Sequence, residues 1–378
     1  MQRLACLVLL GLLAVALPYS WMVTGGTRGR AQTNLAAMLS EGAADAPAGA
    51  AVRALAPKQP LSADLYLVAA VEAKDRNDLP TAERIMLQAI RLDPRLPQAR
   101  LWMGQQALAS GRIEAGVQEL AVLLRLRPQS SSAISLLLAQ AMTDARARQA
   151  VRRILAGNPH LLNVGSAAAA RGIPPAQVLG LFAGTDIDAL PGGRIRAQEA
   201  LTEGYFQQKK YGEARSIWSA FLKEKPGNPV FNGLFKDQNA SPPFNWLLKM
   251  DSDVEAVSVK DEAGPYPSAL QVRSFGTMPV VAAEQYLLLP AGRHQLRFAA
   301  RSADGAKVAW RLNCVEGAPI GELRFAPGPG WKTSAFTFNV PAGCPAQLLR
   351  LVANDPPGAS DASFLVTAVE TSPNAIAD

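Results

Sequence analysis

The chain has 378 residues, of which 49% are hydrophobic and 18% are charged. This composition excludes wholesale disorder, and the length allows two or three domains. The net charge of +7 is unevenly spread: residues 230–378 hold 12 basic and 14 acidic side chains, which leaves a balance of +9 before them. We therefore expect any attraction to an acidic partner to come from the first part of the chain.

The residues that support catalysis are scarce. The three cysteines (Cys6, Cys314, Cys344) and two histidines (His160, His294) have no zinc-ligand spacing, and no phosphate-binding, dinucleotide or GxSxG motif occurs. The acidic stretch from Asp251 to Glu262 lies on one segment, whereas a glycosidase needs two carboxylates on separate elements. We expect no enzyme, no cofactor and no metal, with a calcium ion at this stretch as the minor alternative.

Residues 1–24 read as a membrane anchor or a signal peptide. The twenty residues from Leu4 to Val23 carry no charge, and a helix of that length spans a bilayer. Cleavage after the small residues Ala14-Val15-Ala16 is the alternative. Either reading places the bulk of the chain in the periplasm or another extracytoplasmic space, tethered to the inner membrane if the segment is retained. Residues 25–60 are rich in Ala, Gly and Pro and read as a linker.

Residues 61–228 show paired helix patterns closed by prolines. Pro94 and Pro128 lie 34 residues apart, and Pro226 closes a related segment. An alanine lies twelve residues before two of these prolines, at Ala82 and Ala214. Gly104 and Gly111 fall at a helix-packing and an inter-helix turn position. Small residues let antiparallel helices approach, and proline ends the second helix of each pair.

This pattern resembles the tetratricopeptide repeat (TPR) family over residues 62–226. The resemblance implies an all-α solenoid whose concave surface holds a partner protein. We expect three or four helical pairs, with residues 160–190 as an irregular helical insertion before the last pair.

A basic patch is expected on one helix of this region. The stretch "DARARQAVRR" places two arginines four residues apart with two more beside them: Arg146, Arg148, Arg152 and Arg153. A solvated helix face is the simpler interpretation, and a contact for an acidic polymer, lipid headgroup or acidic partner is the alternative. Nucleic acid is not expected, because no exposed aromatic residues alternate with these arginines.

Residues 229–373 alternate polar and apolar residues, with Gly, Pro and Asp between the runs, and residues 374–378 form a tail. At least seven short strands predict an all-β sandwich of the jelly-roll type. Leu296, Phe298 and Ala300 share one face, and Trp310 is in phase with Cys314. Trp310 is thus expected in the core. In an exported domain, Cys314 and Cys344 are expected to form a disulfide.

The segments "FNGLFKDQNASPPFNWLL", "LLLPAGRHQLRFAAR" and "GWKTSAFTFNVP" resemble the carbohydrate-binding-module-like jelly rolls of bacterial extracytoplasmic proteins. That resemblance implies sugar binding on exposed aromatic rings with polar neighbours. Trp331, in a loop, is the first platform candidate and Trp246 the second, whereas plain packing of both rings is the alternative. Gln285, Arg301 and Arg311 are expected on outward faces as polar partners.

Together these features predict a non-catalytic, membrane-tethered periplasmic scaffold. Its TPR array is expected to bind a partner protein, and its sandwich to contact a polysaccharide in exopolysaccharide or envelope assembly. The alternative is a general protein-protein interaction scaffold without sugar affinity.

Overall fold

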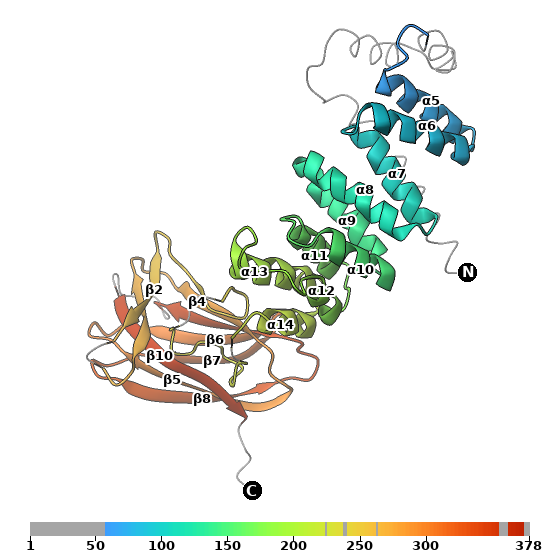
Figure 1. Cartoon of the computed structure of the whole chain (residues 1–378). Coiled ribbons are helices and arrows are strands. Elements are labelled where there is room, and N and C mark those ends of the chain that lie inside the picture. The colour runs from blue at the N-terminus through green and yellow to red at the C-terminus, as the bar shows by residue number, and fades with distance from the viewer. Residues whose placement is uncertain (1–56, 224, 237–239, 262–263, 355–361, 374–378) are drawn as a thin grey trace. The chain divides into compact units, whose positions relative to one another are not determined.

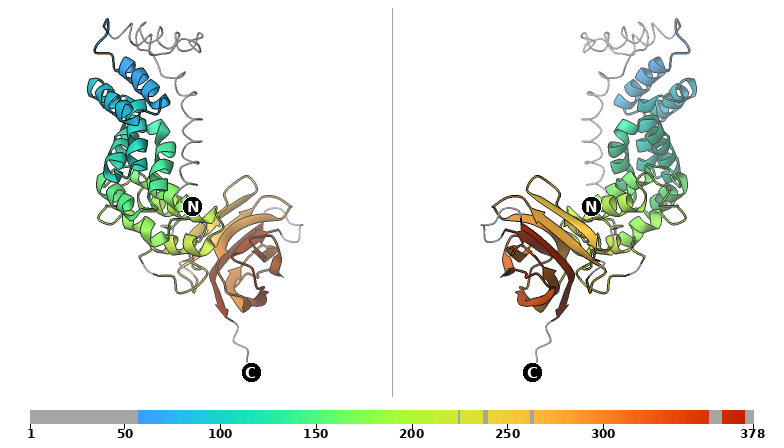
Figure 2. Two further views of the ribbon diagram at one scale, coloured as in Figure 1. Left: turned by 90° about the vertical axis from the view of Figure 1, so that its right-hand side faces the viewer. Right: turned by 90° about the vertical axis from the view of Figure 1, so that its left-hand side faces the viewer.

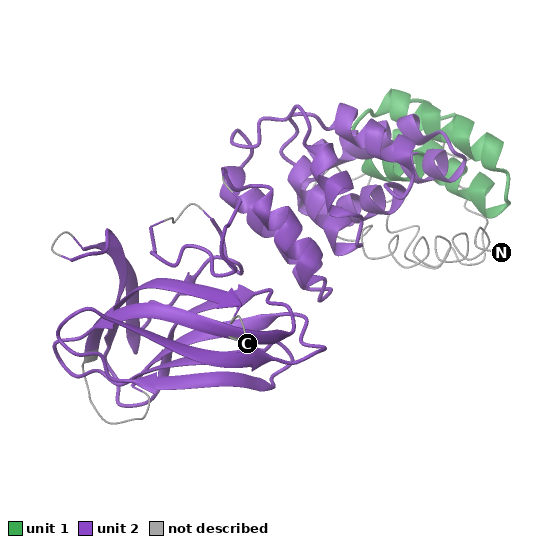
Figure 3. Cartoon of the chain, turned by 90° about the horizontal axis from the view of Figure 1, so that it is seen from below, with its two compact units in different colours: residues 1–103 green, residues 104–378 purple. Residues whose placement is uncertain are grey.

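The structure is a computed structural model that describes residues 57–378 apart from 224, 237–239, 262–263, 355–361 and 374–378 (Figure 1). The predicted anchor or signal, nearly all of the predicted linker, Cys6 and the tail lie outside the described residues. Within the described part, no helix is both long enough and apolar enough to cross a bilayer. The chain divides into two compact units, residues 1–103 and 104–378 (Figure 3).

The described part of the first unit is helical. It contains α5 (Ala63–Asp75), α6 (Leu79–Leu92) and the start of α7 (Pro97–Ala109). Asp78 caps α6 by accepting a hydrogen bond from the Thr81 amide at 3.2 Å. The helices pack through a small core of alanines and long apolar side chains: Ala70, Met86, Ala89, Leu96, Ala99 and Met103.

The second unit begins with two layers of helices. After α7 come α8 (Ile113–Leu126), a 3₁₀ turn (Pro128–Ser130), α9 (Ser131–Ala141), α10 (Ala145–Ile154), α11 (Leu161–Ala170), α12 (Pro175–Leu181), α13 (Gly193–Phe206) and α14 (Tyr211–Ser219). One layer stacks α9, α11 and α13, and the other stacks α8, α10, α12 and α14. Consecutive helices thus alternate between the layers, as the paired sequence pattern predicts.

Glycines permit the close approach of these helices. A Cβ on Gly104 would lie 3.0 Å from the Leu120 side chain, and Gly111 has a φ of +76° in the turn before α8. Both roles were predicted.

The irregular insertion expected at residues 160–190 is wrong. This segment forms a further pair, α11 and the short α12, so the ten described α-helices make five pairs rather than three or four. α12 is the shortest of these α-helices, with 7 residues.

The rest of the second unit is a sandwich of two antiparallel five-stranded sheets (Figure 2). Sheet A has the order β1 (Leu247–Leu248), β4 (Val280–Leu287), β9 (Gln347–Ala353), β6 (Val308–Cys314) and β7 (Pro319–Phe325). Sheet B has the order β2 (Val254–Lys260), β3 (Ser268–Ser274), β10 (Ala362–Pro373), β5 (Gly292–Arg301) and β8 (Lys332–Val340). A helical part followed by a β part is therefore confirmed.

The core of the sandwich lies between the sheets, where alternation predicted it. Leu296, Phe298 and Ala300 are buried from sheet B, and Trp310 is fully buried from sheet A. Cys314 is bonded to Cys344, which confirms the disulfide. The sandwich therefore has one apolar core between its two sheets, and the Cys314–Cys344 disulfide joins the end of β6 to the segment before β9.

Candidate functional site

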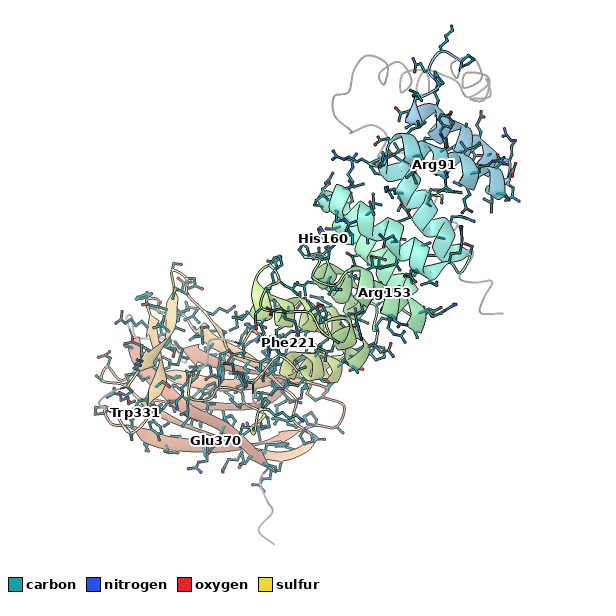
Figure 4. All side chains as sticks on the ribbon, viewed as in Figure 1. Arg91, Arg153, His160, Phe221, Trp331 and Glu370 are labelled. Atoms are coloured by element: carbon teal, nitrogen blue, oxygen red, sulfur yellow. A yellow bond between two sulfur atoms is a disulfide. The ribbon has the colours of Figure 1, made fainter. Side chains whose placement is uncertain are left out.

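The loop that leads into β8 places Trp331 beside the end of β5. Lys332 pairs with Ala300, so Trp331 lies next to Arg301 at this end of the sandwich (Figure 4). The indole Nε1–H of Trp331 donates to Asp261 Oδ2 at 2.9 Å, and Arg301 Nη2 donates to Asp261 Oδ1 at 3.1 Å. Asp261 follows β2 and is only 7% exposed. A buried carboxylate thus holds an arginine and a tryptophan at fixed positions.

The tryptophan ring contacts a second aromatic residue and a cation. The Tyr266 ring lies 5.2 Å from the Trp331 ring, centroid to centroid, at an angle of 72°. The Arg301 guanidinium carbon lies 5.2 Å from the Trp331 centroid, within cation–π range. Both rings are half-buried. We call these residues, Asp261, Tyr266, Arg301 and Trp331, the Trp331 cluster.

The cluster combines apolar ring surface with an arginine whose side chain is 33% exposed. An aromatic ring packs against the C–H face of a sugar, and a guanidinium donates to its hydroxyl or carboxylate oxygens. The indole N–H is already used by Asp261. A ligand would therefore contact the ring surface and the guanidinium edge.

The structure brings together two of the predicted glycan-binding candidates, Trp331 and Arg301, and adds two partners. Asp261 was noted only as part of the acidic stretch, and Tyr266 was not predicted. The sequence around Tyr266, "GPYPS", places an aromatic residue between prolines in a loop. That is the same kind of signal that drew attention to Trp331.

Trp246 lies in the core and offers no platform. It is 5% exposed, packs against Phe235 and Trp310, and donates its Nε1–H to the carbonyl of Asn232 at 3.2 Å. The alternative of plain packing is correct for this residue.

The outward placement expected for Gln285 is wrong. Its side chain is fully buried, accepts from the Phe231 amide at 3.2 Å and donates to the Phe231 carbonyl at 2.9 Å. Gln285 faces inward on β4, where it satisfies both backbone groups of Phe231.

Arg311 does lie on the outward face, but on sheet A, where it approaches Glu322 at 3.8 Å. It belongs to a different face from the Trp331 cluster, whose Arg301 lies on sheet B.

The four arginines of the predicted basic patch all lie on α10. Arg146 pairs with Asp144 at 2.9 Å and thereby lowers the pKa of that carboxyl. Arg153 pairs with Glu114, and Arg148 donates to the carbonyl of Met142 at 2.6 Å. Three of the four arginines therefore have a partner within the chain, and a contact of this patch with an acidic partner stays a prediction.

Neither histidine contacts a residue of the Trp331 cluster in the hydrogen bonds and ring contacts described for it. His294 is buried, contacts the carbonyl of Pro290 at 2.8 Å and stacks on Phe338. His160 precedes α11 (Figure 4). Among the residues that the structure describes, no group of three His, Cys, Asp or Glu side chains is placed to hold a metal ion.

Comparison with known proteins gives structural matches alone. No protein-family model matches the chain. No curated protein matches it either. TmCBM61 in complex with β-1,4-galactotriose is 16% identical with a TM-score of 0.30, covering 39% of this chain and 99% of that one. A CBM4 structure is 14% identical with a TM-score of 0.30, covering 38% of this chain and 99% of that one.

A putative sugar binding protein from Bacteroides thetaiotaomicron is 10% identical with a TM-score of 0.28, covering 40% of this chain and 94% of that one. Several of the similar structures are thus carbohydrate-binding modules. At these identities and TM-scores the likeness carries no inference about a ligand. The resemblance of residues 62–226 to tetratricopeptide repeats stays a prediction.

Proposed function

We propose that the β-sandwich is a non-catalytic glycan-binding module and that the Trp331 cluster is its contact with sugar. The observation that carries this proposal is the pairing of a half-exposed Trp331 with Arg301 through the buried carboxylate of Asp261. A buried charge is costly unless it is paired. This carboxylate holds a half-buried ring and an arginine in place, and such preorganised side chains lose little entropy on binding.

The helices are, in this proposal, a scaffold for a partner protein. Successive pairs stack in two layers, and such stacks present extended surfaces. Exposed apolar side chains on two of these helices, Leu136 and Ile195, are available for such a contact. The specific setting that we propose is exopolysaccharide or envelope polysaccharide assembly.

The proposed location is extracytoplasmic, with residues 1–24 as the tether to the inner membrane. Two observations support it. The Cys314–Cys344 disulfide persists best in an oxidising compartment. The uncharged run from Leu4 to Val23 has the length of a membrane span.

A general protein-interaction scaffold without sugar affinity is the second candidate. It is favoured by two contacts within the cluster. The Trp331 indole N–H already bonds Asp261, and the Arg301 guanidinium already lies over the Trp331 ring. In that function the cluster would simply brace the loops that precede β3 and β8.

A glycan array followed by isothermal titration of the full chain separates the two. We expect saturable binding to at least one polysaccharide, lost in Trp331→Ala and retained in Phe275→Ala, which removes an exposed ring from the β3–β4 loop. Binding that survives Trp331→Ala would place the site elsewhere. No binding by a folded, oxidised chain would leave the protein scaffold.

A further inference from the structure

The outward face of sheet A places two arginines directly opposite each other. Arg311 of β6 pairs in register with Arg350 of β9, and both side chains are between one third and two fifths exposed. Opposed residues on neighbouring antiparallel strands have Cβ atoms about 5 Å apart, and like charges there are destabilising.

A row of charges extends from this pair to both edges of the sheet. Arg350 contacts Glu284 of β4 at 3.2 Å, and Lys249 contacts the same carboxylate at 3.8 Å. On the other side Arg311 approaches Glu322 of β7 at 3.8 Å, and Arg324 contacts that carboxylate at 2.8 Å. The row thus holds four basic and two acidic groups. Its local balance is positive although residues 230–378 as a whole are slightly acidic.

Arg311 borders a shallow hollow in the outward face of sheet A. Ala309 and Val352, which pair with each other beside the row, are almost fully buried and so leave the guanidinium groups and this hollow as the surface that a ligand can reach. A shallow hollow of about 220 Å³ adjoins Arg311 and is lined also by Asn313 and Pro319. A hollow with the exposed Pro319 ring on its wall and a guanidinium group at its edge fits a sugar ring that carries a carboxylate.

The space available beside the row favours a thin ligand. Tyr286 lies two residues from Glu284 on the same face of β4, about 7 Å along the strand. Its ring packs against Phe206 of α13 at a centroid distance of 4.8 Å. Near this contact Lys209 pairs with Glu316, in the β6–β7 turn, at 3.6 Å. Side chains from the end of α13 and the turn after it therefore lie beside the row. An extended polymer fits next to them better than a globular protein does.

We propose that this row, centred on Arg311 and Arg350, binds a carboxylate-bearing polysaccharide. The site is separate from the Trp331 cluster, which lies on sheet B, and adds to the proposed function a preference for acidic glycans. Carboxylates of successive or alternate sugars would engage the guanidinium groups in competition with Glu284 and Glu322.

The test uses the full chain and polygalacturonate, with the fully methyl-esterified polymer as the uncharged control of the same backbone. We expect binding by affinity electrophoresis and titration that weakens as salt rises, and at least about tenfold weaker binding of the ester. The double variant Arg311→Gln/Arg350→Gln is expected to lose at least about tenfold in affinity, because it removes both guanidinium groups that would contact the carboxylates.

The matched control is Arg273→Gln/Arg297→Gln, which removes two exposed arginines of sheet B that pair with Glu255 and Glu370. This control should bind polygalacturonate as the natural chain does. An equal loss in both double variants would show attraction to net charge and overturn the proposal. Equal affinity for poly-glutamate would overturn the assignment to a polysaccharide.

Trp331→Ala distinguishes failure of this proposal from failure of the proposed function. We expect that variant to keep its binding of polygalacturonate. If polygalacturonate does not bind but another glycan binds through Trp331, the arginine row is wrong and the proposed function stands. Should the double variant fail to fold, Arg311→Gln alone leaves the Arg350–Glu284 pair intact and carries the same expectation.

Discussion

Trp218 of α14 donates its indole N–H to the carbonyl oxygen of Ser241 at 2.7 Å, and neither residue is exposed by more than 3%. Gln198 of α13 completes the arrangement by donating to the Trp218 carbonyl at 2.9 Å and accepting from the Ser241 amide at 2.8 Å. The Trp218 ring also packs against Phe231 and Phe244. The last helices and the segment leading into the sandwich therefore share one buried, hydrogen-bonded contact.

Gln198→Ala should destabilise the chain. The substitution leaves the Ser241 amide and the Trp218 carbonyl buried without their partner. Each unsatisfied buried group costs about 1–3 kcal/mol, so we expect a loss of about 2–4 kcal/mol in the free energy of unfolding. Urea denaturation followed by circular dichroism measures it. Gln177→Ala, on the exposed side of α12, is the control and should change little. Equal unfolding midpoints for the two variants would contradict this role.

Reduction of the Cys314–Cys344 disulfide should also lower stability. The bond joins residues separated by 30 positions. Closing a loop of that length contributes about 3–4 kcal/mol in the chain-entropy model. Thermal melts with and without dithiothreitol measure the effect. The variant Cys314→Ser/Cys344→Ser should melt at the same temperature as the reduced natural chain, and dithiothreitol should not change its melting temperature. If the two thiols of the natural chain are shown to be free and its melting temperature equals that of the oxidised chain, the disulfide does not contribute this stability.

Much of the sandwich was predictable because alternation has a strict period of two. In β5 and β6 that period alone placed Phe298 and Trp310 in the core. The pattern is weaker in the edge strands β2 and β7: in β7 no residue is fully buried on either side of the strand. Edge strands bury less, so their alternation is weaker.

The site was only partly predictable, because it depends on contacts distant in sequence. Asp261 lies 70 residues from Trp331, and no local pattern pairs them. The outward orientation predicted for Gln285 was wrong because that side chain also has a partner distant in the sequence. A polar residue in a strand is expected to face water, but here it serves the backbone of Phe231, 54 residues away.

Asp261→Asn should loosen the Trp331 cluster. The amide can still accept one hydrogen bond, but Arg301 loses the charge that compensates it. Because Arg301 is one-third exposed, solvent limits the cost to about 1–2 kcal/mol. In protein labelled with 5-fluorotryptophan, we expect the ¹⁹F resonance of Trp331 to move and broaden, and glycan affinity to fall. Asp304→Asn, at an exposed carboxylate of the next loop, should alter neither. An unmoved Trp331 resonance in Asp261→Asn would show that the carboxylate does not position the ring.

Tyr205 should make the chain less stable at alkaline pH. The phenol is 1% exposed and donates to the carbonyl of Ile173. Burial, and then the charge of Glu213, raise its pKa above the ordinary value. The unfolded chain releases this proton near pH 10 whereas the folded chain keeps it, so the stabilisation is complete below about pH 10 and falls as pH rises above it.

Urea unfolding at about pH 8 and pH 11 tests this, with Tyr205→Phe as the comparison. The natural chain should lose on the order of 1 kcal/mol more than the variant over that interval. Arg215, whose pKa burial lowers to about 10, acts with the opposite sign but is present in both proteins, so its contribution cancels. Tyr286, whose pKa is also raised by burial, cancels for the same reason. Parallel losses in the two proteins would mean that Tyr205 ionises in the folded chain as readily as in the unfolded one.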